Sequence, residues 1–348
     1  MNNASSFELL FASFSKATTK SLWILDENPP LNFPPSTDNI EIISNRFDVV
    51  QRMQALGFKA YFSDFDFSEL LQNSYQFIFY RISKEKALAH YIINKAHNLM
   101  KTDGSLIISG AKQEGIKGYI ERATKLYPHV EVFKADKQHW GASFNQVELL
   151  TNHLDDKNYT QLRSISDKQP NTELRFVSKP GVFGWNKIDQ GSKLLIEHLP
   201  TVFKHLSTPE KVLDIGCGYG YLSVHCARLF NCEVTACDNN AAAIIACSEN
   251  LSTIEKDYQV ISTDCTADIQ QKFDLIVCNP PFHTGFNVEN DLTKRFLKGT
   301  ADCLSSNGIA IFVVNLHIPL AREAEHYFKN ITTVSDDKHF KVITLSNL

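Results

Sequence analysis

The stretch KVLDIGCGYG, residues 211–220, runs from an apolar strand into three glycines placed at every second position. The segment that follows, YLSVHCARLF, has the apolar spacing of a helix. Glycines in such a turn let the backbone approach a ligand closely, because any Cβ would obstruct it. A strand, a glycine turn and a helix in this order predict an α/β domain that holds a cofactor above the turn.

Short apolar runs alternate with helical patterns throughout the second half of the chain. This alternation predicts a mostly parallel sheet that is wrapped by helices on both faces. The last two runs are too close together for a crossover helix, so we expect them to form an antiparallel hairpin. The expected strands are 211–215, 233–237, 259–263, 273–278, 308–314, 330–334 and 340–345.

The first half repeats the same rhythm. A glycine precedes the fifth strand in both halves, Gly104 and Gly308, and the closing hairpins share similar turns, DKQHW at 136–140 and DDKHF at 336–340. We interpret the repeat as an internal duplication, the alternative being chance similarity between two domains of one class. The expected strands are 21–25, 40–44, 59–63, 75–80, 105–109, 130–134 and 143–150.

A chain of 348 residues is long enough for two such domains. We expect a first domain at 1–155, a polar linker at 156–172 and a second domain at 173–348. With 43% hydrophobic and 21% charged residues, the composition is that of an ordinary globular protein without a leader or a membrane span. We therefore expect a cytoplasmic protein.

The charge balance and the cysteines exclude some classes of site. The net charge is −4, so any nucleic-acid surface has to be a local basic patch. All eight cysteines lie in the second half without the spacing of a zinc site, and we interpret them as buried apolar side chains in a reducing compartment. No metal is expected.

Two kinds of cofactor fit a glycine turn. The dinucleotide fingerprint is G-x-G-x-x-G, whereas this chain has G-x-G-x-G with Tyr221 in place of the third dinucleotide glycine. Asp214, two residues before Gly216, suits a cofactor that carries an ammonium group and disfavours a pyrophosphate. S-adenosylmethionine is thus the favoured cofactor, and a dehydrogenase is a remote alternative.

Acidic residues follow the next two strands. Asp238 lies at the end of its strand, where a carboxylate can accept hydrogen bonds from both ribose hydroxyls. Asp264 is placed to accept a hydrogen bond from an adenine amino group. The alternative for each acid is a helix cap or a solvated loop residue. The expected cofactor-binding residues of the turn and the strand ends are Asp214, Gly216, Cys217, Gly218, Gly220, Asp238, Asn239, Asp264, Cys265 and Asn279.

The fourth strand of the second half ends in Asn279-Pro280-Pro281-Phe282. The Asn279 side-chain oxygen and the Pro280 carbonyl can accept hydrogen bonds from an NH₂ group, which fixes a poorly nucleophilic amine with its lone pair toward a methyl donor. Pro281 stiffens the turn, and Phe282 would stack on a planar base or amide. No general base is needed. In isolation the motif could be a simple turn, but after a glycine turn it predicts amine methylation.

On these motifs the chain resembles the class I methyltransferases, and within them the bacterial ribosomal RNA small subunit methyltransferase C family. The resemblance rests on LRFVSKPGVFGWNKIDQGSKLL at 174–195, the glycine turn, CNPPFHTGF at 278–286 and FKV at 340–342. It implies two tandem Rossmann-like domains, each a seven-stranded sheet of order 3-2-1-4-5-7-6. The first domain of that family lacks cofactor chemistry.

The resemblance also assigns residues before the glycine turn. Asp189, Gly191 and Ser192 fall in the segment that closes over the cofactor, and Phe183 lies toward the substrate. The alternative is a helix capped by Asp189 with Phe183 in the core. Gly184 stands where the family has a serine, which puts a role there in doubt.

Several basic residues are candidate RNA contacts. Lys294 and Arg295 follow the Asn-Pro-Pro motif on the substrate side, with a solvated helix face as the alternative. His283 is expected to have a positional role or to be solvated, rather than to act as a base. In the first half, Arg81, Lys84 and Lys86 are candidate phosphate contacts, and an ordinary charged surface is the alternative.

The leading hypothesis is therefore methyl transfer from S-adenosylmethionine to the N2 of a specific guanine in small-subunit (16S) ribosomal RNA. The substrate is the RNA itself or the assembled 30S subunit, and the protein is expected to act as a monomer. Adenine-N6 or glutamine-N5 methylation is an alternative, because each acceptor presents an NH₂ group. A non-catalytic RNA-binding ribosome assembly factor is the alternative from another class.

Overall fold

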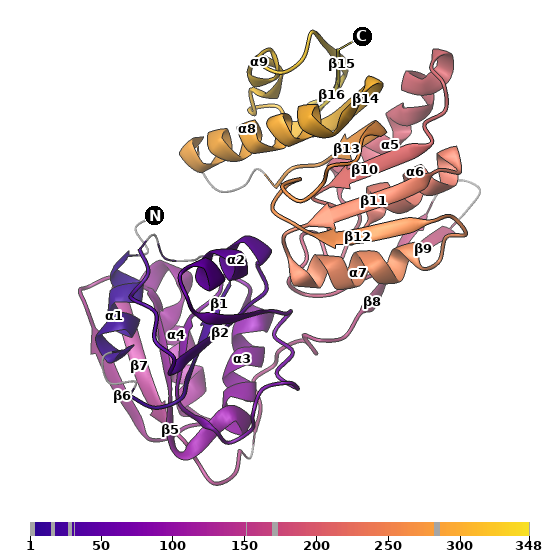
Figure 1. The fold of residues 1–348 in the computed structure, drawn as a ribbon. Helices are drawn as coiled ribbons and strands as arrows, with labels where there is room; N and C mark the ends of the chain where they lie inside the picture. The colour runs from indigo at the N-terminus through magenta and orange to yellow at the C-terminus, as the bar shows by residue number, and fades with distance from the viewer. Residues whose placement is uncertain are drawn as a thin grey trace. The chain divides into compact units, whose positions relative to one another are not determined.

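The computed structural model describes residues 4–14, 18–26, 30, 32–150, 152–168, 173–281 and 286–347. The chain divides into two compact units, Met1–Gln161 and Leu162–Leu348. Each unit is built around a sheet with helices packed on it (Figure 1). No helix within the described ranges has the length and apolar character needed to cross a membrane.

The first unit contains a seven-stranded sheet of order β3-β2-β1-β4-β5-β7-β6. Strands β1 to β5 pair in parallel, and β7 runs antiparallel to both of its neighbours. Its elements are α1 (Ala4–Phe14), β1 (Ser21–Leu25), β2 (Ile40–Ser44), α2 (Phe47–Ala55), β3 (Lys59–Phe62), β4 (Tyr75–Arg81), α3 (Lys86–Leu99), β5 (Met100–Ala111), η1 (Lys112–Glu114), α4 (Ile116–Thr124), β6 (Val130–Lys134) and β7 (His139–Asn145).

The second unit has the equivalent order, β12-β11-β10-β13-β14-β16-β15, preceded by a two-stranded hairpin of β8 and β9. Its elements are β8 (Arg163–Lys168), β9 (Glu173–Ser178), α5 (Gln190–Val202), η2 (Phe203–His205), β10 (Lys211–Ile215), α6 (Tyr221–Phe230), β11 (Glu233–Asp238), α7 (Ala241–Leu251), β12 (Tyr258–Ser262), β13 (Phe273–Cys278), α8 (Phe286–Cys303), β14 (Leu304–Asn315), α9 (Leu320–Ala324), β15 (Asn330–Asp336) and β16 (Phe340–Ser346).

The predicted fold class is confirmed, because both sheets have the order 3-2-1-4-5-7-6 and end in an antiparallel hairpin. The hairpin turns are also built alike. Oδ1 of Asp136 accepts hydrogen bonds from the backbone N–H groups of Gln138 and His139, and Oδ1 of Asp337 accepts them from those of His339 and Phe340. The two turns share this use of an aspartate, but Asp337 is the second residue of DDKHF whereas Asp136 is the first residue of DKQHW, so the match between the two sequences is offset by one residue in the structure.

The last strand of the first sheet differs from its expected bounds. It was expected at 143–150, but β7 starts at His139, directly after the turn that Asp136 closes. After Asn145 the chain leaves the sheet, and the Gln146 side chain donates to the backbone oxygen of His97. The apolar residues at 147–150 resemble a strand, but they lie beyond the ladder.

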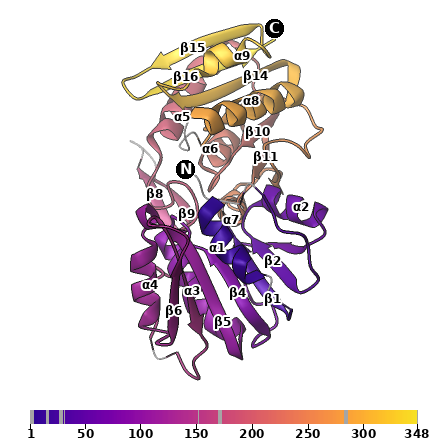
Figure 2. The same ribbon diagram turned by 90° about the vertical axis from the view of Figure 1, so that its left-hand side faces the viewer.

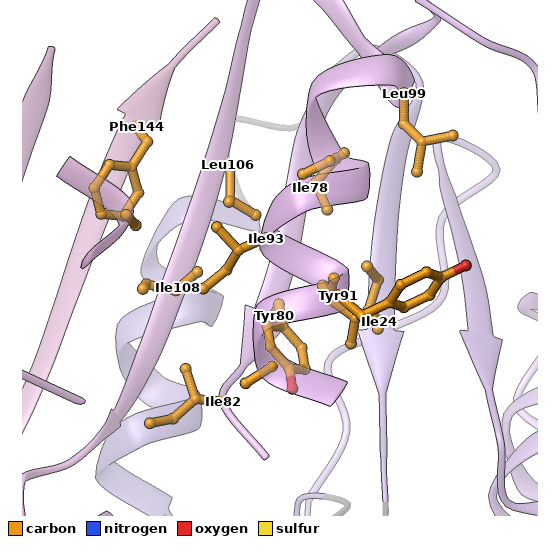
Figure 3. Packing of buried hydrophobic residues seen from close by; sticks show 14 of the residues in the cluster. Ile24, Ile78, Tyr80, Ile82, Tyr91, Ile93, Leu99, Leu106, Ile108 and Phe144 are labelled. Carbon is orange, nitrogen blue, oxygen red and sulfur yellow. The ribbon is translucent and has the colours of Figure 1, made fainter. Parts of the chain in front are cut away.

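The core of the first unit has two layers. Ile24, Ile78 and Ile108 of the sheet pack against Ile93 and other buried residues of α3 on one face (Figure 3). On the opposite face, α1 and α2 cover Trp23, which is fully buried. Alternating strand residues thus point to opposite helical layers, as the pleat of a sheet requires.

The second unit is layered in the same way. Residues of α5, α6 and α7 pack on one face of the sheet, and α8 and α9 pack on the other. Figures 1 and 2 both show α8 beside β14. Because β10, β11 and β13 are central, their carboxyl ends lie side by side. This edge is where doubly wound sheets bind ligands.

The segment expected as a linker at 156–172 is only partly one. Tyr159 is buried in the first unit, where its hydroxyl donates to Oδ1 of Asp64 at 2.7 Å. Strand β8 begins four residues later and pairs with β9 as part of the second unit. The segment 156–172 therefore contains a strand despite its polar sequence, and the inward residues of that strand, such as Ile165 and Asp167, are buried.

Candidate functional site

The glycine turn between β10 and α6 faces open space at its centre. Gly218 has φ +56°, and no heavy atom lies within 4 Å of the position that a Cβ would occupy. Gly220 has φ +84°, but its Cβ would lie 2.8 Å from Sγ of Cys247 on α7. Gly220 is therefore required for packing, whereas Gly218 leaves room for a ligand above the turn.

Asp214 lies beneath this turn and is 1% exposed. Its Oδ2 accepts hydrogen bonds from the backbone nitrogen and the hydroxyl of Ser223, at 3.0 and 2.6 Å. Among the described residues, none donates a hydrogen bond to its buried Oδ1. Burial raises the pKa of Asp214 to about 7. A carboxyl group with an unpaired buried oxygen fits a nearby cationic group, which would favour its charged form.

Asp238 closes β11 beside the turn. Its Oδ2 accepts a hydrogen bond from the Gly218 backbone nitrogen at 3.0 Å, and its Oδ1 accepts one from Asn240 at 2.9 Å. The backbone nitrogens of Gly216 and Cys217 donate to the carbonyl of Cys237. The carboxylate is thus fixed at the rim of the turn, half-buried, with lone pairs left for hydroxyl donors. Asn239 is half-buried next to it.

Asp264 and Cys265 follow β12 at the same edge of the sheet. Cys265 has φ +55°, so the chain turns sharply there. The carboxylate of Asp264 forms an ion pair with the guanidinium of Arg295 on α8. The structure therefore brings a predicted cofactor residue together with a residue predicted to contact RNA, and no local pattern in the sequence indicates this pairing.

Asn279 follows β13 and is held by the segment before the glycine turn. Its Nδ2 donates to Oδ2 of Asp189 and to Oγ of Ser192, both at 2.8 Å. A carboxylate oxygen can only accept, so the NH₂ end of the Asn279 amide must face Asp189. The amide oxygen is then presented in another direction as an acceptor. Pro280 is buried and Pro281 is exposed, while Phe282 and His283 lie outside the described residues.

Helix α5 begins at this contact. Oδ2 of Asp189 also accepts a hydrogen bond from the Ser192 backbone nitrogen at 2.9 Å, so Asp189 caps the helix. A Cβ on Gly191 would lie 3.2 Å from both Asp189 Oδ2 and the ring of Phe340. The cap expected as an alternative role is thus present, and the same carboxylate also positions Asn279.

Phe183 and its neighbour Val182 differ in burial. Phe183 is 56% exposed, so its alternative assignment to the core is wrong, and the neighbouring Val182 is buried instead. Gly184 has φ +64°, a conformation in which a serine would be strained. The departure from the family pattern at this position therefore matches the backbone conformation.

The predicted basic contacts differ in their exposure. Arg81 is 2% exposed and forms an ion pair with the buried Glu114, so its prediction as a phosphate contact is wrong. Lys84, Lys86 and Lys294 are exposed. The pattern of charges in the sequence could not distinguish them, because the partner of Arg81 lies 33 residues away in the chain.

Asn250 and Asn240 are site residues that sequence reasoning missed. The Asn250 side chain is 4% exposed, accepts a hydrogen bond from Val177 N and donates to the carbonyls of Val177 and Tyr219. It thereby ties β9 to the glycine turn. Asn240 caps α7 and donates to the Gly181 carbonyl at 2.9 Å. Its N-cap position was readable from sequence, but its contact with Gly181 was not.

The cysteines are all free, and seven of the eight are buried, as expected for apolar side chains. Burial raises the pKa of the thiols of Cys237 and Cys278 well above the ordinary range. These thiols stay protonated and are poor nucleophiles or ligands. Cys265 is half-buried at the edge of the site.

Comparison with known proteins identifies the family. Residues 173–344 match the model of the methyltransferase small domain. The ribosomal RNA small subunit methyltransferase C of Shewanella denitrificans is 30% identical over 263 residues, 74% of this chain and 73% of that protein. The Shewanella loihica protein of the same name is 28% identical over 260 residues, 74% of this chain and 73% of that protein.

A solved structure has the same fold over nearly the whole chain. It is a T. thermophilus 16S rRNA N2 methyltransferase in complex with AdoMet and guanosine, with a TM-score of 0.81 and 22% identity. The similarity covers 94% of this chain and 88% of that chain. With the glycine turn, the Asn-Pro-Pro motif and the two equivalent sheets in place, the chain belongs to the ribosomal RNA small subunit methyltransferase C family.

Proposed function

We propose that this protein transfers a methyl group from S-adenosylmethionine to the exocyclic N2 of a guanine in small-subunit (16S) ribosomal RNA. The observation that carries the proposal is the fixed amide of Asn279, whose nitrogen is held by Asp189 and Ser192. Its oxygen can accept a hydrogen bond from an incoming NH₂ group. The names of the relatives support guanine in ribosomal RNA as the acceptor.

The residues at the carboxyl edge of the second sheet fit the methyl donor. Gly218 leaves space above the turn. The buried Oδ1 of Asp214 can be attracted to the positive charge of an ammonium group. Asp238 can accept hydrogen bonds from the ribose hydroxyls. Gly216, Cys217, Gly220, Asn239, Asp264, Cys265, Gly191 and Ser192 complete the proposed pocket. When bound, S-adenosylmethionine supplies a methyl group bonded to a positively charged sulfur.

The chain's own residues hold the amine rather than deprotonate it. Asn279 Oδ1 and the Pro280 carbonyl each accept a hydrogen bond from the NH₂ group, and the nitrogen lone pair is then directed at the methyl donor. Pro281 keeps these acceptors in place, and Phe282 is proposed to stack on the base. After transfer the amine loses its extra proton to solvent. Phe183 and His283 are proposed to lie near the base.

The first domain is proposed to have lost cofactor chemistry, and the strand registers support this. In the first sheet Ser21 of β1 pairs with Phe77 of β4, and in the second sheet Val212 of β10 pairs with Leu275 of β13. Matching these two pairs makes Ser21 equivalent to Val212. By that register Trp23 takes the place of Asp214. Trp23 is fully buried among aromatic rings, including those of Phe11 and Phe14. An indole there cannot serve as a counterion for an ammonium group.

The same register matches Arg81 with Asn279, because each lies four residues beyond Phe77 or Leu275. Arg81 offers only donors, and its ion pair with Glu114 is buried. A guanidinium cannot accept hydrogen bonds from an NH₂ group. We therefore propose that the first domain binds RNA or braces the second domain, with Lys84 and Lys86 as exposed candidate contacts.

Small ribosomal subunits from a strain that lacks this gene test the proposal. The purified protein and S-adenosylmethionine are added either to these subunits or to their extracted RNA, and the nucleosides are analysed by mass spectrometry. We expect N2-methylguanosine in small-subunit RNA, formed far more slowly with Asn279→Ala. N6-methyladenosine or methylated protein glutamine as the sole product would contradict the proposal. Cofactor binding without any methyl transfer would favour an assembly factor.

A further inference from the structure

Helix α8 packs one face along the loop that follows β12. On this face Arg295 pairs with Asp264, a Cβ on Gly299 would overlap Oγ1 of Thr266, and Sγ of Cys303 lies 3.6 Å from the Ile269 carbonyl. The three helix residues are spaced by four, so they lie in one row. The row follows the loop from 264 to 269 step by step.

The loop itself is a compact turn. The backbone nitrogen of Ala267 donates to the carbonyl of Asp264 at 3.2 Å, and that of Ile269 donates to the carbonyl of Thr266 at 3.0 Å. Gly299 is buried, and its missing side chain lets the helix backbone approach Thr266. Arg295 therefore extends from a fixed helix to a fixed turn. Its pairing with Asp264 follows from how closely these two elements pack.

We propose that Arg295 is a positioning residue of the cofactor site, where it orients the Asp264 carboxylate toward the amino group of the adenine, rather than an RNA contact. The inference rests on the proposed adenine role of Asp264. Arg295 contacts Oδ1 of Asp264, and the second oxygen of a carboxylate can also accept a hydrogen bond, here from the amino group. Without the guanidinium, the half-exposed carboxylate can rotate, and it loses its preference for an amino group.

The packing of α8 makes this role distinct from that of its neighbours. Phe296, the next residue, is 5% exposed, and its ring lies 3.6 Å from the Cβ position of Gly216. The helix thus contacts both the glycine turn and the adenine side of the proposed pocket. Lys294 is exposed, and Lys298 forms its ion pair with Asp302 of the same helix.

The test measures binding without an acceptor. S-adenosylhomocysteine and its 6-oxo analogue S-inosylhomocysteine are titrated calorimetrically into the wild-type protein, Arg295→Ala, Arg295→Lys and the matched control Lys294→Ala. The wild type should prefer the amino compound by about tenfold or more, since a hydrogen bond to a charged group is at stake. Arg295→Ala should lose most of this preference, Arg295→Lys should recover part of it, and Lys294→Ala should keep it.

A double-mutant cycle with Asp264→Ala gives a second readout. If Arg295 acts through Asp264, adding Arg295→Ala to Asp264→Ala causes little further loss of affinity. Unchanged preference in Arg295→Ala, together with weaker RNA binding, would overturn the inference in favour of an RNA contact. Because no acceptor is present, a protein that binds the adenine compound but methylates another acceptor would contradict the proposed function and leave this inference standing.

Discussion

The side-chain nitrogen of Asn279 donates to Oδ2 of Asp189 at 2.8 Å, although 90 residues separate the two in the chain. Ser192 accepts from the same nitrogen, so two residues at the start of α5 fix one amide. The amide oxygen is held in place before any acceptor arrives. Because the Asn279 side chain is already ordered in the folded protein, ordering it adds no entropic cost when the acceptor binds and reacts.

Asn279→Ala is expected to lower kcat by about 100-fold or more, the typical effect of removing one preorganised polar group from a reacting centre. Affinity for S-adenosylhomocysteine should change much less. Asp189→Ser should reduce kcat as well, because the shorter side chain can cap α5 but cannot hold Asn279 in the same way. Single-turnover kinetics and calorimetry on each variant separate the two effects. Equal kcat in wild type and Asp189→Ser would rule out the positioning role of Asp189.

Gly218→Ala and Gly220→Ala should fail for different reasons. Both residues have positive φ, so each alanine costs about 1–2 kcal/mol of strain. The Cβ of Gly218→Ala projects into open space, so the variant should fold but bind S-adenosylhomocysteine poorly. The Cβ of Gly220→Ala meets Cys247 Sγ at 2.8 Å and should lower the melting temperature more strongly. Thermal melts with and without ligand compare them, and normal ligand affinity in Gly218→Ala would contradict the proposed pocket.

Asp214 should make cofactor binding depend on pH. Burial raises its pKa to about 7, so below pH 7 the folded protein holds a proton there. An ammonium group nearby favours the carboxylate, so binding releases that proton. Affinity should then fall by up to about tenfold per pH unit below 7. Asp214→Asn should remove this slope, and calorimetry in buffers of different ionisation enthalpy counts the protons released.

The same group has an opposite consequence for folding. The unfolded carboxyl titrates near 3.8 and the folded one near 7, so between these values only the folded protein keeps the proton. Stability contributed by the group is therefore complete below the unfolded pKa and is lost as pH rises through 7. Asp214→Asn should flatten the fall in unfolding free energy across this range. Identical denaturation profiles of both proteins from pH 5 to 8 would contradict the assignment.

Asn250→Ala should destabilise the second unit by about 2–4 kcal/mol, because it leaves the buried polar groups of Val177 and Tyr219 without partners. Asn250→Asp keeps an acceptor for the Val177 nitrogen but removes both donors, so it should also weaken the tie to the glycine turn. Denaturant unfolding gives the free energies. Ser248→Ala, on the same helix, serves as the control, and an equal effect in both would argue against the role of Asn250.

Local sequence determined much of this protein. The glycine turn, the Asn-Pro-Pro motif at the end of β13 and most strands could be predicted because apolar periodicity and turn chemistry act over a few residues, whereas the strand order of both sheets followed from the family resemblance. The polar strand β8 was missed, since its pairing with β9 and its burial come from the second unit rather than from its own composition.

Tertiary structure alone decided which polar groups meet. It buried Arg81 against Glu114, paired Arg295 with Asp264 and joined Asp189 to Asn279. Each of these pairs joins residues about 30 or more positions apart in the chain. A charged or amide side chain carries no local mark of its partner, because the partner is chosen by how helices pack on the sheet. The sequence thus determined where the proposed site lies, and packing determined how its side chains are held.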